Sequence, residues 1–525
     1  MADIVLTDHR GGRNGIDSPL GIGPTQCCEA VNVDFEDGPL GTKRRGASVV
    51  TTGAVDLSAG VYSMYRHVPG GDEGAAEMWC VTVAGAVARL TTSGWAAVTI
   101  DDAITGEYQN VEFKTFNGKL FIAYKSAVNR LHVYDPAVSA IRRVGLTQPA
   151  APTVANTGAG TYAATLRYYR VRYIQYDGTT VSRRSEASAS TAFTPSGTGT
   201  AARITKPAAL SERETHWEVE VSTDNAVWIV LAGVANGNPI VIATTTYDDS
   251  ATSYSTLATA EEAGLFGLPT SVRYLSTDGN RLLMSGTYES EKTSRIWFSP
   301  VLGTADHGDD ERLVSTLTVK GWVDLNEKDG GGIAGMSDAI GGTPVAFKQR
   351  QSYKLVPTGD VTAPYLPRRI SNVVGTIASK SIVQAEDAGG NPAIAWLSHK
   401  GAYRFGAEGL VKISRDIDDV WFGLWGNYAN NPINLSATTV IAHGVYHTDR
   451  HQIWWWFSRG SNNSPDIRVV VDVRRNVTQD QFGMRGGWMI HTGKSCKAVC
   501  SVMFANTTGN PMSKDLKPYV SYLAV

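Results

Sequence analysis

An all-β fold, a β-propeller with an inserted immunoglobulin- or fibronectin-like β-sandwich, is predicted by three features of the sequence. Short runs rich in β-branched and aromatic residues recur along the chain, separated by turns that contain Gly or Asn. The resulting hairpins recur every roughly 40 to 60 residues, which is the size of a four-stranded propeller blade. Helical periodicity is nearly absent, so strands are expected to supply most of the core.

The length and composition of the chain favour a large folded protein with more than one core. The 525 residues exceed what one core usually serves, and 42% of them are hydrophobic. The 54 glycines suit the many tight turns that short strands need. Charged residues make up 19% and the formal net charge is -2, which excludes a strongly basic nucleic-acid binder and a disordered acidic chain.

The cysteines and the N-terminus predict a soluble protein made in a reduced compartment. Cys27 and Cys28 are adjacent and cannot easily bridge each other, and Cys496 and Cys500 have no second pair to complete a zinc site. With Cys80 the number is odd, so we expect the thiols to pack as small apolar groups. The N-terminus lacks the apolar centre of a signal peptide, and no run approaches the ~20 apolar residues of a membrane helix.

Residues 1–146 are expected to form an N-terminal arm and the first propeller blades. Residues 11–46 combine a Pro- and Gly-rich stretch with more apolar residues than a solvated tail carries. We therefore expect an extended arm that lies on the chain's own propeller or on a neighbouring subunit. Its removal is expected to leave the propeller folded and to weaken assembly. A clear blade hairpin follows at residues 111–136.

Residues 147–266 break this rhythm and are predicted to form the inserted β-sandwich. The segment opens with a linker rich in Pro, Ala, Gly and Thr and continues with about seven short strands over roughly 115 residues, the size of an immunoglobulin-like domain. Alternation at residues 169–173 and 217–221 predicts strands with one face in a core and the other in water. Propeller-type hairpins on both sides indicate an insertion.

Residues 267–525 are predicted to hold the remaining blades. Within AIAWLSHKGAYRFGAEG, two short strands flank a turn at His399, Lys400 and Gly401. Comparable hairpins occur at residues 272–300, 341–360 and 449–475. We expect the two flanks of the insertion to close one propeller, with the sandwich as an outward appendage.

The N-terminal segment resembles the opening of many virion proteins of tailed bacteriophages. Those proteins show a Gly-Gly-x-Asn start, an Asn-Val-x-hydrophobic step and then Gly-x-Leu-x-x-Arg-x-Gly. The matching residues here are Gly11, Gly12, Asn14, Asn32, Val33, Gly38, Leu40, Arg44, Arg45 and Gly46. The later segments VAFKQRQSYKLVPTGD, VVGTIASKSIV, IAWLSHKGAYRFGAEGLVKIS and GGWMI are similar to propeller segments of the same group.

This resemblance implies a tail hub or nozzle protein of a short-tailed phage. Such a protein is a β-propeller that assembles as a ring, typically of six subunits, below the portal and adaptor. On this basis we expect a virion tail protein, made in the host cytoplasm, that contacts copies of itself, the portal or adaptor, and tail fibres or other tail proteins. Genomic DNA would pass through the channel without specific binding.

Few side-chain constellations in the sequence point to chemistry. His443, His447 and His451 stand four apart and would share one face of a helix, but the local pattern is strand-turn-strand, so we interpret them as turn and edge histidines rather than a metal site. The stretch STDNAVW, residues 222–228, is similar to the Asp-box of sialidase-type propellers. It lacks the glycine and is one residue short, and we interpret it as a hairpin turn.

Two acidic runs, DDE at residues 309–311 and DD at residues 418–419, could in principle supply the acid and base of a glycoside hydrolase. We interpret them as surface-loop residues, because nothing in the sequence marks them as buried. The basic run KRR at residues 43–45 could contact a phosphate or a neighbouring subunit's carboxylates. Three charges are too few for nucleic-acid binding.

The densest aromatic run is IWWWF at residues 453–457. In a strand, Trp455 would point away from Trp454 and Trp456, and we interpret both sides as buried between blades. Sugar stacking or a subunit contact are the alternatives. No GxxxxGK[ST], HExxH, GxSxG or paired CxxC motif occurs, so we expect no cofactor, no metal site and no catalytic residue.

The sequence favours a structural subunit of the tail hub or nozzle ring, which continues the DNA ejection channel and docks other tail proteins. We expect no enzymatic activity. The near-neutral charge is compatible with this function, because a strongly basic lumen would retain the DNA that has to pass. The alternative is a carbohydrate- or receptor-binding propeller of the phage tail with the sandwich as its adhesive module, and a propeller glycoside hydrolase is a third possibility.

Overall fold

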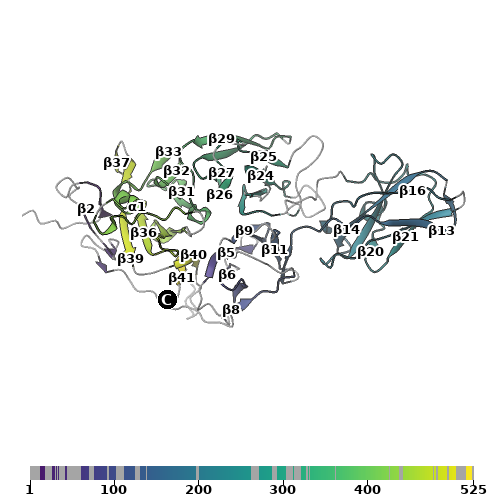
Figure 1. The fold of residues 1–525 in the computed structure, drawn as a ribbon, viewed down its shortest axis with the longest axis horizontal. Helices are drawn as coiled ribbons and strands as arrows, with labels where there is room; N and C mark the ends of the chain where they lie inside the picture. Colours follow the sequence, from purple (N-terminus) through teal and green to yellow (C-terminus); the bar gives the residue numbers. More distant parts are fainter. Residues whose placement is uncertain are drawn as a thin grey trace, which may run out of the picture.

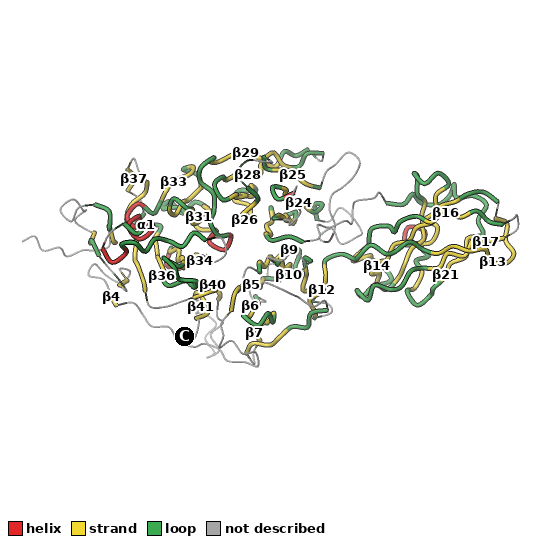
Figure 2. Tube along the Cα trace, in the orientation of Figure 1, coloured by secondary structure: helices red, strands yellow, loops and turns green. Residues whose placement is uncertain are grey.

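The computed structural model confirms an all-β propeller with an inserted immunoglobulin- or fibronectin-like sandwich (Figure 1). In the described part of the chain, helices are short turns (Figure 2). The structure describes residues 12–17, 26–29, 31, 33–34, 42–43, 61–69, 76–91, 94–101, 111–124, 130–136, 139–162, 164–196, 200–261, 271–286, 292–302, 311, 321–326, 329, 331–360, 362–424, 426–436, 442–476, 478–480, 483–492, 496–503 and 516–522.

Within the described residues, six antiparallel sheets form the blades, and each contains four strands in sequence order. The first two blades are β5 (Val61–His67), β6 (Glu77–Thr82), β7 (Val87–Thr91) and β8 (Gly94–Ala97), then β9 (Glu112–Phe116), β10 (Lys119–Ala123), β11 (His132–Asp135) and β12 (Ala140–Arg143). The third and fourth are β22 (Tyr274–Thr277), β23 (Leu282–Ser285), β24 (Arg295–Phe298) and β25 (Trp322–Asp324), then β26 (Ile333–Ile340), β27 (Thr343–Lys348), β28 (Ser352–Pro357) and β29 (Tyr365–Ser371).

The fifth blade contains the hairpin predicted around His399. It consists of β30 (Val383–Glu386), β31 (Pro392–Ser398), β32 (Gly401–Gly406) and β33 (Gly409–Lys412). The turn ends at Gly401, whose φ of 122° is one that residues with a side chain rarely adopt. The sixth blade consists of β34 (His443–His447), β35 (Gln452–Phe457), β36 (Ile467–Asp472) and β39 (Trp488–Thr492).

The first strands of successive blades meet around a common axis. β9 contacts β5 and β22, β22 contacts β26, and β30 contacts β26 and β34. The hairpin of β40 (Cys496–Met503) and β41 (Leu516–Tyr522) lies where the ring closes, because β40 contacts both β34 and β5. Short elements join successive blades: η6 (Ser379–Ser381) precedes the fifth blade, and η7 (Arg415–Ile417), α1 (Asp418–Phe422) and η8 (Gly426–Tyr428) precede the sixth. Within the sixth blade, η9 (Thr448–Arg450) connects β34 to β35, and the hairpin of β37 (Thr478–Asp480) and β38 (Gly483–Arg485) lies between β36 and β39.

The described part of the predicted N-terminal arm lies on the chain's own propeller. β1 (Gly12–Arg13) pairs in parallel with β39, and β2 (Gln26–Cys27) pairs in parallel with β1, so both extend the outer edge of the sixth blade. Arg13 is buried and forms an ion pair with Asp419 of α1. Cys27 and Val33 pack against Met489 of β39. A further hairpin joins β3 (Val33–Asp34) to β4 (Thr42–Lys43).

The core of the propeller lies in layers between neighbouring blades. Trp79 of β6 packs with Phe113 of β9, for example, and Phe347 of β27 packs with Trp396 of β31. The layer between the second and third blades joins residues from the two sides of the insertion, with Phe121 of β10 against Leu275 of β22. The two flanks therefore close one propeller.

The insertion projects from the rim of the propeller as two packed sheets (Figure 1). One sheet contains β13 (Thr153–Tyr162), β17 (Thr200–Thr205) and β21 (Thr246–Asp249). The other contains β15 (Val181–Arg184), β14 (Arg167–Tyr176), β18 (His216–Ser222) and β19 (Ile229–Ala232), with β16 (Thr191–Phe193) on β14 and β20 (Ile240–Val241) on β18. The 3-10 turn η3 (Val234–Asn236) follows β19.

For β14 and β18, the sequence predicted one face in a core and the other in water; the first prediction is confirmed and the second is wrong. Tyr169 and Trp217 lie in the sandwich core, as expected. The opposite face was expected to be wet, but Arg172 and Glu220 are buried there and form an ion pair. The covering segment is residues 258–261, which pairs with the edge of β19 and accepts a hydrogen bond from Arg172 at the carbonyl of Glu261.

Deleting residues 149–257 and joining the ends with a short Gly/Ser linker is expected to leave a folded propeller. The reason is that the layer between the second and third blades forms without any residue of the deleted segment. Circular dichroism and a cooperative thermal transition would measure this. The control is deletion of residues 272–300, which removes part of a blade and is expected to abolish that transition. Loss of soluble protein on the first deletion would contradict the prediction.

Candidate functional site

The three histidines singled out in the sequence do not form a metal site. His443 and His447 lie in β34, the first strand of the sixth blade, which is an edge strand of its sheet, as interpreted, and both side chains are buried. They share a face because strand positions an even number apart point the same way. His451 does lie in a turn, beside Glu386. Among the described residues, no group of three or more His, Cys, Asp or Glu side chains is placed to hold a metal ion.

The tryptophan run of β35 alternates as predicted. Trp455 is buried between the fifth and sixth blades, where its Nε1 donates to the carbonyl of Ser381 (2.9 Å). Trp456 points to the other face and stacks on His443, with ring centroids 5.6 Å apart. Trp454 lies on that same face, where the guanidinium of Arg468 covers its ring. Packing between blades accounts for Trp455, whereas Trp454 and Trp456 contact side chains of the sixth blade itself, so only one of the two faces packs between blades as interpreted.

The described residues of the acidic runs, Glu311, Asp418 and Asp419, are buried and form ion pairs, contrary to their interpretation as surface-loop residues. Asp418 forms an ion pair with Lys412, and Asp419 forms the buried ion pair with Arg13. Glu311 is buried and forms an ion pair with Arg142 (2.7 Å). The arginines that pair with Asp419 and Glu311 lie far away in the chain, so local sequence could not predict these two ion pairs.

The remaining runs fall in turns or outside the described residues. Residues 222–228 form the turn between β18 and β19, where the Asp224 carboxylate accepts backbone N–H bonds from Ala226 and Val227 (both 2.9 Å). Asp309, Asp310, and the two arginines of the basic run at residues 43–45 lie outside the described residues. Of the cysteines with described side chains, Cys80 is buried, and burial raises the pKa of Cys27 to about 11.

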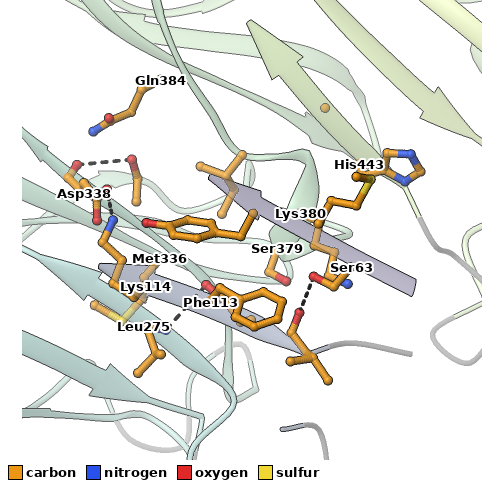
Figure 3. A pocket seen from close by; sticks show the side chains of 17 residues that line it. Ser63, Phe113, Lys114, Leu275, Met336, Asp338, Ser379, Lys380, Gln384 and His443 are labelled. Carbon is orange, nitrogen blue, oxygen red and sulfur yellow. Dashed lines mark hydrogen bonds and ion pairs between the residues drawn. The ribbon is translucent and has the colours of Figure 1, made fainter. Parts of the chain in front are cut away.

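A cavity of about 300 Å³ on the propeller axis is the strongest candidate site. All six blades and η6 line it, and the charged and polar residues on its wall are drawn in Figure 3. Glu112 and Lys114 come from β9, Asp338 from β26 and Lys380 from η6. The sequence interpretation missed these four residues. A signal was present in VEFKTF, where Val111 and Phe113 alternate with two charged residues in a strand that otherwise suits a core.

An ion pair and two backbone contacts fix the charged side chains of this cavity. The Lys114 ammonium contacts the Asp338 carboxylate, whose other oxygen accepts the backbone N–H of Thr277 (3.1 Å). The ammonium of Lys380 donates to the carbonyl of Tyr62 (2.9 Å). Burial alone would lower the pKa of Lys114, but the Asp338 carboxylate raises it, so this lysine stays charged.

Glu112 is the group in the cavity with the most altered acidity. Burial raises its pKa to about 8, against the lowering effects of the Leu275 N–H and of Lys380 and Lys114. Its Oε1 lies 3.4 Å from that N–H, which is a weak hydrogen bond. Near neutral pH the carboxyl therefore keeps its proton, and it can donate a hydrogen bond into the cavity.

No known protein family matches the sequence. No curated protein sequence matches it either. Among solved structures, the chain is similar to Hsv2 of Kluyveromyces lactis, with a TM-score of 0.30 and 9% identity over 83% of this chain and 98% of that one. It is similar to YCF48 bound to D1 peptide, with a TM-score of 0.26 and 10% identity over 77% of this chain and 90% of that one.

The chain is also similar to dihydro-heme d1 dehydrogenase NirN in complex with DHE, with a TM-score of 0.24 and 10% identity over 64% of this chain. It spans 56% of the length of that protein. Similarities of this size carry no argument about function, and the propeller fold rests on the order of strands in the sheets. In the described part of the chain, no helix is long and apolar enough to cross a membrane.

Replacing Glu112 with Gln is expected to stabilise the protein at alkaline pH and to leave it nearly unchanged at pH 5. The folded-state pKa is about 8, whereas the carboxyl of an unfolded chain titrates near its ordinary 4.5. Stability from the retained proton is complete below the lower value and is lost as the pH rises towards 8. Glutamine carries no such dependence, so we expect its advantage to reach about 2–4 kcal/mol at pH 9.

Urea unfolding at pH 5, 7 and 9 would measure this difference. Glu186→Gln, in the sandwich and outside the cavity, is the matched control and should show no growing advantage. An unchanged difference between Glu112→Gln and the parent protein from pH 5 to pH 9 would show that Glu112 is ionised throughout.

Proposed function

We propose that this protein is a structural subunit of a short-tailed bacteriophage tail, of the hub or nozzle type, which assembles as a ring and docks other tail proteins. The resemblance of the N-terminal and propeller segments to such proteins supports the proposal. In this role the chain carries no catalytic activity. It functions through binding surfaces on the propeller and the sandwich, whose relative positions are fixed.

The observation that carries the proposal is the junction between the propeller and the sandwich. On the propeller side, the Glu311 carboxylate accepts hydrogen bonds from Arg142 (2.7 Å) and from the backbone N–H of Gly145 (2.9 Å). On the sandwich side, Arg183 donates to the carbonyl of Gly145 (3.0 Å). The connecting residues are therefore held from both sides.

Two further contacts fix the sandwich against the second blade and its neighbour. Glu212 accepts hydrogen bonds from the backbone N–H of Thr147 (2.8 Å) and from Arg143 (3.0 Å). Arg213 forms an ion pair with Asp101, which precedes the second blade. A module held in this way presents its surface at a set angle, and a subunit with rigid parts loses less conformational entropy on assembly.

The axis of a single propeller is not the DNA passage in this proposal. The axial cavity measures about 300 Å³, and the Lys114–Asp338 ion pair lies on its wall. Such a space is far too small for duplex DNA. The ejection channel would therefore lie at the centre of the ring, between subunits.

Native mass spectrometry and light scattering of the full chain, alone and mixed with portal and adaptor proteins, test the proposal. We expect a ring of several subunits or a stable complex with the adaptor. A matched variant, Arg143→Ser with Arg213→Ser, removes two of the contacts that hold the sandwich without changing the axis and is expected to assemble more weakly. A protein that stays monomeric with every virion component and binds a host glycan would favour the carbohydrate- or receptor-binding alternative.

A further inference from the structure

We propose that the axial cavity binds a small polyhydroxylated carboxylate, such as a sugar acid. This inference is independent of the proposed assembly function. It rests on the position of the cavity, its balance of charges and the hydrogen-bonding capacity of its wall.

The wall of the cavity gathers side chains from strands that are far apart in the sequence. Figure 3 shows Lys114, Asp338 and Gln384 with Ser63 and Lys380 around one space. Lys114 and Asp338 are separated by 224 residues and meet only because the ring is closed. A ligand in this position would contact several blades at once.

The balance of charges favours an anion. Lys114 and Lys380 carry positive charge and Asp338 carries negative charge, so the wall has a net charge of +1 while Glu112 is protonated. Ionisation of Glu112 brings this sum to zero. In a partly enclosed space, a single net charge attracts a counterion more strongly than it would at the open surface.

The uncharged groups of the wall favour hydroxyls on that anion. Ser63 donates its proton to the carbonyl of Val111 (2.8 Å), and Ser337 donates to the carbonyl of Asp338 (3.2 Å). Their oxygens are therefore left as acceptors, which suit the hydroxyl donors of a sugar. The amide of Gln384 can donate and accept, and the protonated Glu112 can donate to a carboxylate.

The proton on Glu112 links binding to pH. The charged or titratable groups that face it are Lys114 on its own strand, Tyr65 on β5, Asp338 on β26, Lys380 on η6 and His443 on β34. Above a pH of about 8, binding must recapture a proton, so each further pH unit weakens it. Between pH 7 and pH 9 the loss of affinity is expected to be about tenfold.

Isothermal titration of the full chain with D-glucuronate, and with D-glucose as the neutral probe, tests the inference. Glucuronate is expected to bind at pH 7 and to bind about tenfold more weakly at pH 9. Glucose is expected to give no heat at the same concentrations. Glu112→Gln should bind glucuronate with the same affinity at both pH values, because its amide is neutral throughout.

A second variant tests whether the positive charge of Lys380, rather than the shape of its side chain, is needed for binding. Lys380→Met keeps the alkyl stem and is expected to weaken glucuronate binding by tenfold or more at pH 7, whereas Lys354→Met on β28, away from the cavity, should bind as the parent does. Thermal melts of each variant confirm that it is folded. Equal binding of glucose and glucuronate, or no heat from either probe, would overturn the inference, and the second result would mean that the cavity holds only solvent.

Discussion

Replacing Arg13 with Met is expected to lower the free energy of unfolding by about 3–5 kcal/mol. The Arg13 guanidinium donates to Asp419 Oδ1 (2.9 Å), and both side chains are buried. Methionine has a similar length and no charge, so Asp419 would remain buried without its main cation. The pair also joins β1 to α1, and the loss should therefore free the N-terminal strand from the sixth blade.

Urea unfolding at pH 7 would measure the change, and two variants would show its cause. Arg203→Met removes a similar pair with Asp248 that is 46% and 43% exposed, and it should cost less than about 1 kcal/mol. Adding Asp419→Asn to Arg13→Met removes the unpaired charge and should restore part of the loss. A cost for Arg13→Met as small as that for Arg203→Met would show that water reaches the Arg13–Asp419 pair.

The position of Arg13 also changes an expectation drawn from the sequence. Removal of the first 46 residues was expected to leave the propeller folded and to weaken only assembly. Because Arg13 and Gly12 are part of the sixth blade, the truncation should instead destabilise that blade. Weaker assembly of the truncated protein would then follow from its lower stability.

The second large effect is expected for Glu311→Gln, which should also cost about 3–5 kcal/mol at pH 7. Glu311 forms ion pairs with Arg142 (2.7 Å) and Lys119 (3.0 Å), and the arginine is buried. Burial alone would raise the pKa of Glu311, but Arg142 and Lys119 hold it below its usual range. Such a carboxylate contributes stability above its unfolded pKa, and this contribution is lost as the pH falls.

The parent protein should therefore lose stability below about pH 4.5, and Glu311→Gln should lack this part of the acid dependence. Unfolding curves at pH 7 and pH 4 would measure both effects. Limited proteolysis supplies a local readout, because the junction beside Gly145 should be cut faster in the variant. Asp329→Asn, whose carboxylate pairs with Arg369 where both side chains are exposed, is the control. Identical acid profiles for Glu311→Gln and the parent protein would contradict the prediction.

The sequence predicts those parts of the fold that depend on local patterns. Alternation identified the core face of β14 and β18, with Tyr169 and Trp217 inward, because side chains of a strand point to opposite faces in turn. The hairpin at His399 followed from its turn residues. The second face of the same strands was predicted to be exposed, which is wrong, because the segment that ends at Glu261 covers it. No local sequence pattern indicates that this later segment folds back onto the sheet.

The candidate site could not be predicted for a related reason. Glu112 and Lys114 lie on β9, Asp338 on β26 and Lys380 on η6, and only the closed ring brings these three elements to one cavity. From the local sequence alone, a charged residue in a strand is predicted to be exposed to water. The same limit explains Asp419, whose partner Arg13 lies near the other end of the chain.

The pairing of β1 with β39 has a consequence for the order in which the protein folds. Gly12 is made early in synthesis and pairs with Trp488, which is made near its end. At about 5–20 residues per second, a ribosome needs roughly 25–100 s to make a chain of this length. The sandwich, being continuous, can fold during that time, whereas the first strand must wait with its partners absent. Folding of the ring should therefore be slow and finish after the chain leaves the ribosome. Until then β1 lacks its partner strand, so we expect a chaperone that assists folding to bind this N-terminal segment.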